Sequence, residues 1–434
     1  MNPPATPIGP AGTGLGALRF GGLPLLLALL ALLSGCAVGP NYHPPKSEVS
    51  PRFANGQQTN LAPTQSAIQW WRAFRDPQLD ALVERALAAN YDLRIATARV
   101  REARALHTQA LADAFPVVTG QAAYNKSLSS IDSVPFPLTR AQRELQLFTV
   151  GFDATWELDI FGGVRRQIQA AGADLGAIQA QGQDVMVSVL SEVARNYVEL
   201  RGQQNLLEVA QRNADNQREN LELTVARANA GRGTELDTAR AQAQLEATLA
   251  ATPPLQANIK HAIYRLGVLT GQTPTALEPA LSKPAPIPDL PALTAIGNPA
   301  ELLRRRPDIR AAERALAAAT ARIGVATADL FPRVTFNGNL GFSANHLSGL
   351  GRSGSDAYGF GPNITWAALD LGHVRARLNA ARAHADGALA AYRQTVLLAL
   401  EETENALTDF GHERARRDYL QDSERAAIAA MSLA

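Results

Sequence analysis

The chain has 434 residues, a formal net charge of +1 and a single cysteine, and aromatic residues make up only 6% of it. The balanced charge excludes the basic footprint of a nucleic-acid-binding protein, and one cysteine excludes a framework of intramolecular disulfides. The length permits a large core, but few aromatic residues among many alanines favour long helices that pack closely along their length.

Residues 1–35 are predicted to be a lipoprotein signal peptide. The apolar run Leu23–Leu33 follows Arg19 and is too short to span a bilayer as a helix, which is typical of a signal sequence. Its end resembles the lipobox of bacterial lipoproteins, which here consists of Leu33, Ser34, Gly35 and Cys36. We expect Cys36 to carry the lipid; a plain signal peptide with an incidental cysteine is the alternative. Ala37, rather than aspartate, follows the cysteine, which favours sorting to the outer membrane.

A lipid-anchored, Pro-rich tether is expected next, over residues 36–75. Gly39–Pro45 is typical of an extended, polyproline-like segment. Trp70 and Trp71 are interpreted as packing residues, and we expect ordered structure to begin near them, with a helix starting at Pro77.

Two passages share one pattern: an alternating strand, a tryptophan, a glycine corner and a long helix rich in Ala, Arg and Gln. Trp156 and Gly162 in the first passage correspond to Trp366 and Gly372 in the second, and each pair is 210 positions apart. We expect these four residues to form the strand-to-helix corners of a duplicated architecture.

The duplication predicts three regions after the tether. Repeat 1 is expected over residues 76–275 and repeat 2 over residues 299–434, with a Pro-rich linker at residues 276–298 between them. Phe115 and Phe331, each followed by proline, are a further match, 216 positions apart. The repeated unit therefore combines strands with very long helices.

Four segments alternate between apolar and polar residues with the period of a β-strand: 117–126, 145–156, 333–342 and 358–366. Each has roughly the length that a tilted strand needs to cross a bilayer. The residues expected to face lipid are Phe148, Phe152, Val334, Phe336, Phe360 and Ile364. The half-buried sheet of a soluble protein alternates in the same way, so this alternative stays open. Lipid does not tolerate open sheet edges, so a membrane sheet of four strands requires an oligomer, and a trimer would supply about twelve strands.

No proline interrupts residues 162–231, which predicts one continuous helix on the order of 100 Å long, at 1.5 Å per residue. Glycines should end this helix, and a threonine cap should start a returning helix that continues to a break at Pro253. The two helices would form a hairpin whose tip contains Gly231, Arg232, Gly233, Thr234 and Asp237. A soluble coiled coil is the alternative for this hairpin.

Three arginines at residues 304–306 precede Pro307, a residue that suits the first position of a helix. We interpret them as a solvated helix end and a packing corner rather than as an anion-binding site.

The sequence contains no motif for enzyme chemistry. The seven histidines are scattered without a His-x-x-x-His pair, and the glycine-rich run 349–361 lacks the Lys-Ser/Thr of a phosphate loop. We therefore expect no catalytic residues, no cofactor and no metal site.

Together these passages resemble the outer membrane factor (TolC-like) family, in particular its NodT-type lipoprotein branch, which works with RND efflux pumps. The passages are Leu33–Tyr42, Trp156–Gly162, Ala230–Asp237, Arg306–Glu313, and Arg322–Ala326 with Phe331-Pro332. The resemblance covers nearly everything after the signal region. It implies a mixed α and β fold, in which four transmembrane β-strands per protomer form a trimeric twelve-stranded barrel. Long α-helical hairpins would continue the barrel as a periplasmic tunnel.

The resemblance also implies a function. The protein would be a passive trimeric duct in the outer membrane, lipid-anchored and extending into the periplasm, that exports small molecules or drugs. Its partners would be two further copies of itself, outer-membrane lipid, a periplasmic adaptor (membrane fusion) protein and an inner-membrane RND-type pump, with no nucleic acid. Residues 231–237 would meet the adaptor. An outer-membrane duct for type I protein secretion and a non-pore periplasmic coiled-coil adaptor are the alternatives.

The resemblance further implies a second helical tip in repeat 2. Gly231 lies 75 positions after Trp156, so its counterpart is expected at roughly position 441, past Ala434. The second tip turn, its returning helix and the family's gate aspartates on that helix are expected to lie outside this sequence, which resembles a family member truncated at its C-terminus.

Overall fold

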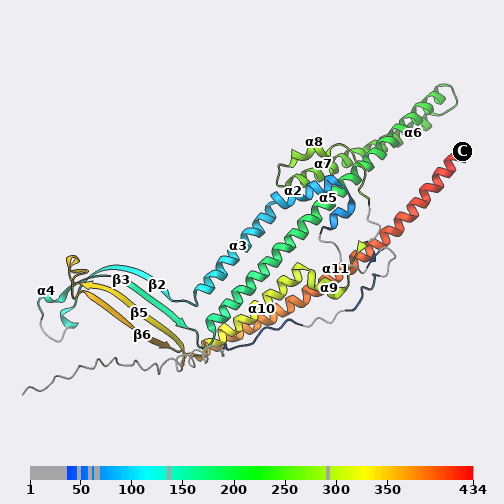
Figure 1. Ribbon diagram of the computed structural model, residues 1–434. Coiled ribbons are helices and arrows are strands. Elements are labelled where there is room, and N and C mark those ends of the chain that lie inside the picture. Colours follow the sequence, from blue (N-terminus) through cyan, green and yellow to red (C-terminus); the bar gives the residue numbers. More distant parts are fainter. Residues whose placement is uncertain are drawn as a thin grey trace, which may run out of the picture.

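The computed structural model is an elongated protomer with a β-sheet at one end and a helical hairpin at the other (Figure 1). It describes residues 37–45, 50–56, 61–62, 69–133, 138–289 and 294–433. The predicted signal peptide and the lipobox with Cys36 lie outside these residues. Within them, no helix is both long enough and apolar enough to cross a membrane.

The elements follow one another in the order that the duplication predicts. The helices are α2 (Pro77–Ala89), α3 (Tyr91–Ala112), α4 (Arg140–Arg143), α5 (Gly163–Asn229), α6 (Glu235–Ala250), α7 (Thr252–Leu269), α8 (Glu278–Leu281), α9 (Pro299–Arg305), α10 (Pro307–Ala328) and α11 (Leu371–Leu433). The strands are β1 (Leu61–Ala62), β2 (Val117–Leu128), β3 (Glu144–Leu158), β4 (Thr294–Ala295), β5 (Arg333–Ala344) and β6 (Asp356–Thr365). Short 3₁₀ turns cover Trp70–Phe74, Ile131–Ser133, Pro274–Leu277 and Leu347–Gly349. The four long predicted strands and the long predicted helix are all present.

The duplication is visible in the lengths of the elements. Helices α3 and α10 have 22 residues each, and strands β2 and β5 have 12 residues each. The second member of each pair begins 216 positions after the first, the same spacing as the Phe-Pro match in the sequence. The two halves of the chain are therefore copies of one helix–strand–strand–helix unit.

The four long strands form one antiparallel sheet in the order β2-β3-β5-β6. The register places Phe152 opposite Gly120 on one side and Leu340 on the other, and pairs Leu340 with Tyr358. Because side chains alternate between the faces of a strand, this register puts the phenylalanines and the tryptophan of the four strands on one face of the sheet and their threonines and asparagines on the other. The predicted alternation thus corresponds to a single continuous apolar face.

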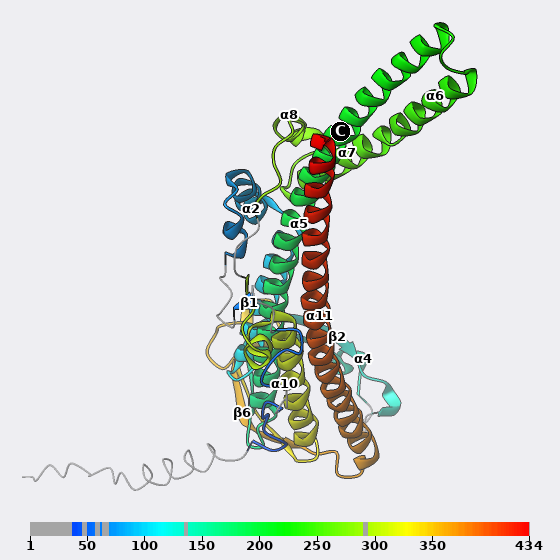
Figure 2. The ribbon, with the colours of Figure 1, turned by 90° about the vertical axis from the view of Figure 1, so that its right-hand side faces the viewer.

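Helix α5 has 67 residues and is the helix against which most of the others pack. Helices α3, α7 and α10 pack along it, and α10 also packs on α11. Figure 2 shows α5 and α11 as the long helices of the molecule, with the shorter α10 beside them and the α5–α6 hairpin projecting at the end away from the sheet. The small residues of α5 and α10 allow these helices to approach closely: beside Gly176 of α5, a Cβ would lie 3.2 Å from Cδ of Arg314 in α10.

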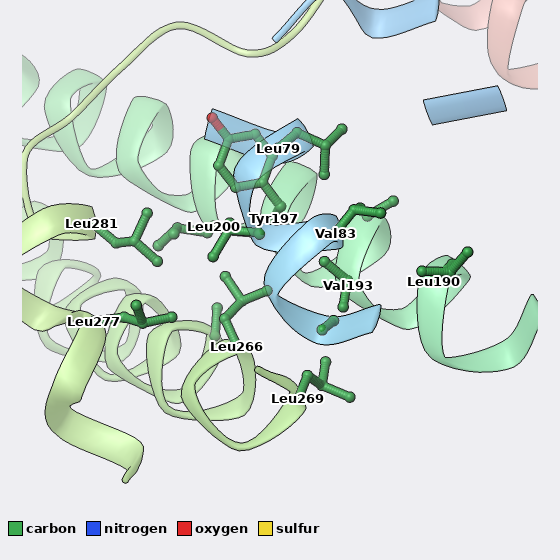
Figure 3. Close-up of a cluster of buried hydrophobic side chains, with 14 of the residues drawn as sticks. Leu79, Val83, Leu190, Val193, Tyr197, Leu200, Leu266, Leu269, Leu277 and Leu281 are labelled. Carbon is green, nitrogen blue, oxygen red and sulfur yellow. The ribbon is translucent and has the colours of Figure 1, made fainter. Parts of the chain in front are cut away.

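The main hydrophobic core lies part-way along α5, where α2, α7 and α8 surround it (Figure 3). One face of α5 enters this core through Val193, Tyr197 and Leu200, which are almost completely buried. Trp71 is buried in the same cluster, which confirms its interpretation as a packing residue. The cluster fixes the helices that connect the sheet with the hairpin.

The linker and the tether differ from the expectation. Residues 276–298 contain α8 and a β4 strand that pairs in parallel with β1, and Leu277 and Leu281 join the main core. These leucines bury their side chains in spite of the surrounding prolines, because an apolar side chain is more stable in a core than in water. Residues 37–45 lie packed against α5 and α10, where Arg166 binds the carbonyl of Gly39 and Glu313 binds Tyr42.

Candidate functional site

The two tryptophans occupy matching positions where the sheet meets the helices. Trp156 Nε1 donates a hydrogen bond to the carbonyl of Ala114 at 3.0 Å, and Trp366 Nε1 donates to the carbonyl of Leu330 at the same distance. Ala114 and Leu330 lie in the turns between a helix and the first strand of each repeat. Each indole therefore ties the end of the second strand of its repeat to the start of the first, as the prediction of paired corners requires.

The glycines of the two corners behave differently. Gly162 has a φ of 82°, a left-handed conformation that favours glycine, and a Cβ there would lie 2.5 Å from the Cα of Ala37. Gly372 lies in the first turn of α11, its φ is not positive, and a Cβ there would meet nothing within 4 Å. Gly372 thus lies where the end of β6 leads into α11, but without the left-handed backbone and the close contact of Gly162.

Asp159, which no sequence motif predicted as a functional residue, caps the first turn of α5. Its carboxylate accepts hydrogen bonds from the amides of Val164 at 3.0 Å and Arg165 at 2.9 Å, and from the Arg165 guanidinium at 3.0 Å. A carboxylate at a helix N-terminus is stabilised by the unpaired amides and the helix dipole. The sequence signal for this cap is the aspartate that lies three residues before Gly162.

The tip at the far end has the predicted turn. Gly231 has a φ of 67°, and the amide of Arg232 reaches back to the carbonyl of Arg227 at 2.9 Å, which closes α5. The amide of Thr234 donates to Asp237 Oδ2 at 3.0 Å, and Thr234 Oγ1 donates to the same oxygen at 2.7 Å. The amide of Asp237 donates back to Thr234 Oγ1 at 3.3 Å, and this reciprocal pair is a capping box that starts α6. The structure therefore places Gly231, Arg232, Gly233, Thr234 and Asp237 together in one exposed turn.

The Asp237 carboxylate is held ionised by this cap. The hydrogen bonds from the Thr234 hydroxyl and amide lower the pKa of Asp237 below its ordinary value. The carboxylate is fully exposed, so its role in the monomer is to cap α6 at the end of the hairpin.

The arginines before Pro307 form a packing corner. Arg306 Nη2 contacts Asp308 Oδ2 and Glu402 Oε2, both at 2.7 Å, and so ties the start of α10 to α11. Burial opposes the charge on Asp308, but the hydrogen bond and charge of Arg306 outweigh burial, so the pKa of Asp308 falls below its ordinary value. Arg304 remains exposed at the helix end, as predicted.

The family model described as outer membrane efflux protein matches residues 82–272 and 298–434. The chain belongs to the outer membrane efflux protein family.

Relatives of this outer membrane efflux protein cover most of its length. Nodulation protein T of Rhizobium leguminosarum bv. trifolii is 34% identical over 379 residues, which are 87% of this chain and 79% of that protein. The solvent efflux pump outer membrane protein SrpC of Pseudomonas putida is 31% identical over 427 residues, 94% of this chain and 87% of that protein. The solved structure of the outer-membrane channel OprN is 44% identical, has a TM-score of 0.83, and covers 88% of this chain and 84% of that chain.

These similarities agree with the geometry of the molecule. The family and the OprN structure have the mixed α and β fold of outer-membrane channels, as the resemblance in the sequence implied. The protein is therefore an outer-membrane channel component of an efflux system, and it extends from the outer membrane into the periplasm. Members of this family are channels rather than enzymes.

Proposed function

We propose that three copies of this chain form one continuous passive duct that carries small molecules from an inner-membrane RND-type pump across the outer membrane. The observation that carries this proposal is that one apolar-faced sheet and one long helical hairpin lie at opposite ends of a single protomer (Figure 1). The sheet suits the bilayer, and the hairpin suits the aqueous periplasm.

The trimer follows from the two edges of the sheet. Strands β2 and β6 are its outer strands, so each has one edge without a strand partner among the residues that the structure describes. Unpaired backbone groups are too costly in lipid, so the edges must pair with further copies until a barrel closes. Three copies supply about twelve strands, which lies within the size range of such barrels. In this proposal repeat 1 (76–275) and repeat 2 (299–434) each contribute two strands and part of the tunnel wall.

The corners of the two repeats would mark the boundary between membrane and periplasm. Trp156 and Trp366 are partly exposed, and each indole N–H is bonded to a carbonyl. An aromatic ring with an apolar body and a polar end is typical of the membrane–water interface. We place Gly162 and Gly372 just on the periplasmic side of this boundary.

The tip is the proposed docking surface for a periplasmic adaptor protein. Residues 231–237 lie at the end of the hairpin farthest from the sheet, and a Cβ at Gly231 would meet nothing within 4 Å. The capping box of Thr234 and Asp237 gives the tip a defined shape without help from the rest of the chain. Such a rigid, exposed end suits contact with a separate protein.

Cys36, at the end of the lipobox Leu33–Gly35, is proposed to carry the lipid anchor. Each buried methylene contributes about 0.8 kcal/mol, so several acyl chains would hold the protein firmly in the membrane. A Cys36→Ala variant should lose fatty-acid labelling and accumulate as the precursor. Unchanged incorporation of labelled palmitate in that variant would refute the anchor.

The proposed cargo is a small molecule rather than a protein. SrpC, which is 31% identical, is named for solvent efflux. This supports efflux over the type I protein secretion duct, and the sheet argues against a coiled-coil adaptor without a pore. A water-filled duct needs no dedicated binding pocket, so the cargo would be chosen by the pump.

The proposal can be tested with the full chain in an efflux-null strain that supplies its cognate adaptor and pump. Expression should restore resistance to organic solvents, and the purified protein should form trimers that conduct ions across planar bilayers. Conductance without restored resistance, combined with export of a reporter protein, would favour the secretion duct. Monomers without conductance would contradict a pore altogether.

A further inference from the structure

The segment that follows Cys36 in the chain is seated in a groove between α5 and α10. The amide of Val38 donates a hydrogen bond to the carbonyl of Phe161 at 3.0 Å. Gly39 has a φ of 86°, and a Cβ there would lie 2.5 Å from the Cα of Gly324 in α10. Backbone therefore packs directly on backbone at this point, and only glycine permits the approach.

Arg166, in the first turn of α5, holds this segment from the other side. Its side chain is almost completely buried, with a relative exposure of 3%. The guanidinium donates to the carbonyl of Val38 at 3.0 Å, to the carbonyl of Gly39 at 3.1 Å and to Asn41 Oδ1 at 2.9 Å. A buried cation is costly unless its donors are satisfied, and here the segment itself supplies three of the acceptors. Gln169 of the same helix accepts a further hydrogen bond at 2.9 Å, so most of the partners of this buried charge come from the segment.

A glycine in α10 makes room for this arginine. A Cβ at Gly324 would lie 2.7 Å from both Cγ and Cδ of Arg166. Gly324 therefore contacts the segment through Gly39 and the arginine through its side chain. The slot is built from two helices that belong to different repeats.

The repeats differ at both of these positions. The residue 210 positions after Arg166 is Ala376, and the residue 216 positions before Gly324 is Thr108. Two repeats share one N-terminal segment, so only one corner needs the slot. The departure from the repeat at Arg166 and Gly324 indicates that these residues serve the segment and not the common architecture.

The same segment contacts α10 and α11 farther along. Tyr42 donates a hydrogen bond to Glu313 Oε1 at 2.7 Å, and the guanidinium of Arg314 lies over its ring, 5.6 Å from the centroid. The amides of Ala54 and Asn55 donate to Glu404 of α11 at 2.8 and 3.2 Å. The segment thus touches three helices from both repeats.

We propose that residues 37–45 and 50–56 form an N-terminal strap, and that Arg166 is the positioning residue that seats it across α5, α10 and α11. Ala37 then lies against Gly162, at the boundary between sheet and helices. The strap fixes the point at which the chain leaves the channel body, and it also joins the two repeats. The strap itself does not depend on the proposed function. Only the expectation that acyl chains on Cys36 enter the bilayer beside the sheet rests on it.

Hydrogen–deuterium exchange of the full chain in detergent tests this inference. In an Arg166→Met variant, the amide of Val38 should exchange roughly ten-fold faster, because its segment loses hydrogen bonds to a charged group. A matched Arg195→Met variant changes an exposed arginine of the same helix and should leave the strap protected. Unchanged protection of residues 37–45 in Arg166→Met would overturn the proposal, as would equal loss in both variants.

A second pair of variants tests the slot without removing the charge. Gly324→Ala pushes the Arg166 side chain out of its place, whereas Gly202→Ala adds a methyl to α5 where nothing lies within 4 Å. Faster exchange of the strap only in Gly324→Ala supports the proposal, and no difference between the two contradicts it.

A Cys36→Ala variant separates the strap from the lipid anchor and from channel function. The strap should stay protected in this variant, because Arg166 and not the lipid holds it. Loss of strap protection in Cys36→Ala alone would overturn the proposal. A failure of conductance or efflux with a protected strap would instead bear only on the proposed function.

Discussion

Trp156 donates its indole hydrogen bond to the carbonyl of Ala114, and this contact recurs in the second repeat between Trp366 and Leu330, at 3.0 Å in each. The contact joins the last residues of one strand to the turn that precedes the neighbouring strand. Each repeat therefore closes its own strand pair at the end that meets the helices. The direction in which α5 and α11 leave the sheet follows from this closure.

Replacement of either tryptophan by phenylalanine should destabilise the protein to a similar extent. The substitution keeps an aromatic ring but leaves the carbonyl of Ala114 or Leu330 without its donor, at a cost of about 0.5–1.5 kcal/mol. Thermal unfolding of Trp156→Phe and Trp366→Phe in detergent measures this loss. Tyr419→Phe, at an exposed position on α11, is the control and should not change the transition. A loss in only one tryptophan variant would show that the two corners are not equivalent.

Arginine substitutions should separate the two faces of the sheet. Phe152 and Phe360 lie on the apolar face, so arginine there should cost on the order of 2–4 kcal/mol near the bilayer midplane. Thr149 and Asn337 lie on the opposite face, so arginine there should be tolerated. Yield of folded trimer in outer-membrane fractions gives the comparison. Equal effects on both faces would mean that the apolar face does not meet lipid.

A bulky residue at the tip should block docking without harming assembly. Gly231→Trp projects into open space and strains the turn by about 1–2 kcal/mol, because its φ is positive. Efflux in the complemented strain should fall at least ten-fold, while trimers remain intact on gels. Gly351→Trp is a matched control, since Gly351 also has a positive φ and open surroundings but lies in the loop between β5 and β6. Normal efflux in Gly231→Trp would place the docking surface elsewhere.

The ion pairs of Arg306 should make the junction of α10 and α11 sensitive to acid. The pKa of Asp308 is lowered in the folded protein, so its contribution to stability is present above the ordinary value of 3.8 and is lost as pH falls through the lower folded value. Arg306→Gln should reduce stability by about 1–3 kcal/mol at pH 7 and flatten this acid dependence. Unfolding midpoints between pH 7 and pH 3 report both effects. Arg304→Gln, at the exposed helix end, is the control and should behave as the parent chain. If stability falls with acid equally in Arg306→Gln and in the parent chain, the Arg306–Asp308 pair is not the cause of the acid sensitivity.

Features set by neighbouring residues could be predicted from the sequence. The period of two predicted the strands, and the lack of proline between Gly162 and Gly231 predicted the long helix. Thr234 was likewise expected to cap the returning helix, and it does so. Each of these features acts within one element or turn. The spacing between Trp156 and Trp366 likewise revealed the duplication before any contact was known. Local sterics and hydrogen bonding decide such features, so the order of residues carries them.

Features set by contacts between distant segments were decided only in three dimensions. The single apolar face depends on the register of β3 against β5, and the slot for Arg166 depends on the approach of Gly39 to Gly324. Gly162 and Gly372 match in sequence, yet only Gly162 has a left-handed backbone, where Ala37 packs against it. The chain determines which helices and strands form, because backbone geometry is local. Which of their surfaces meet depends on close packing between residues far apart in the sequence, which no local pattern specifies.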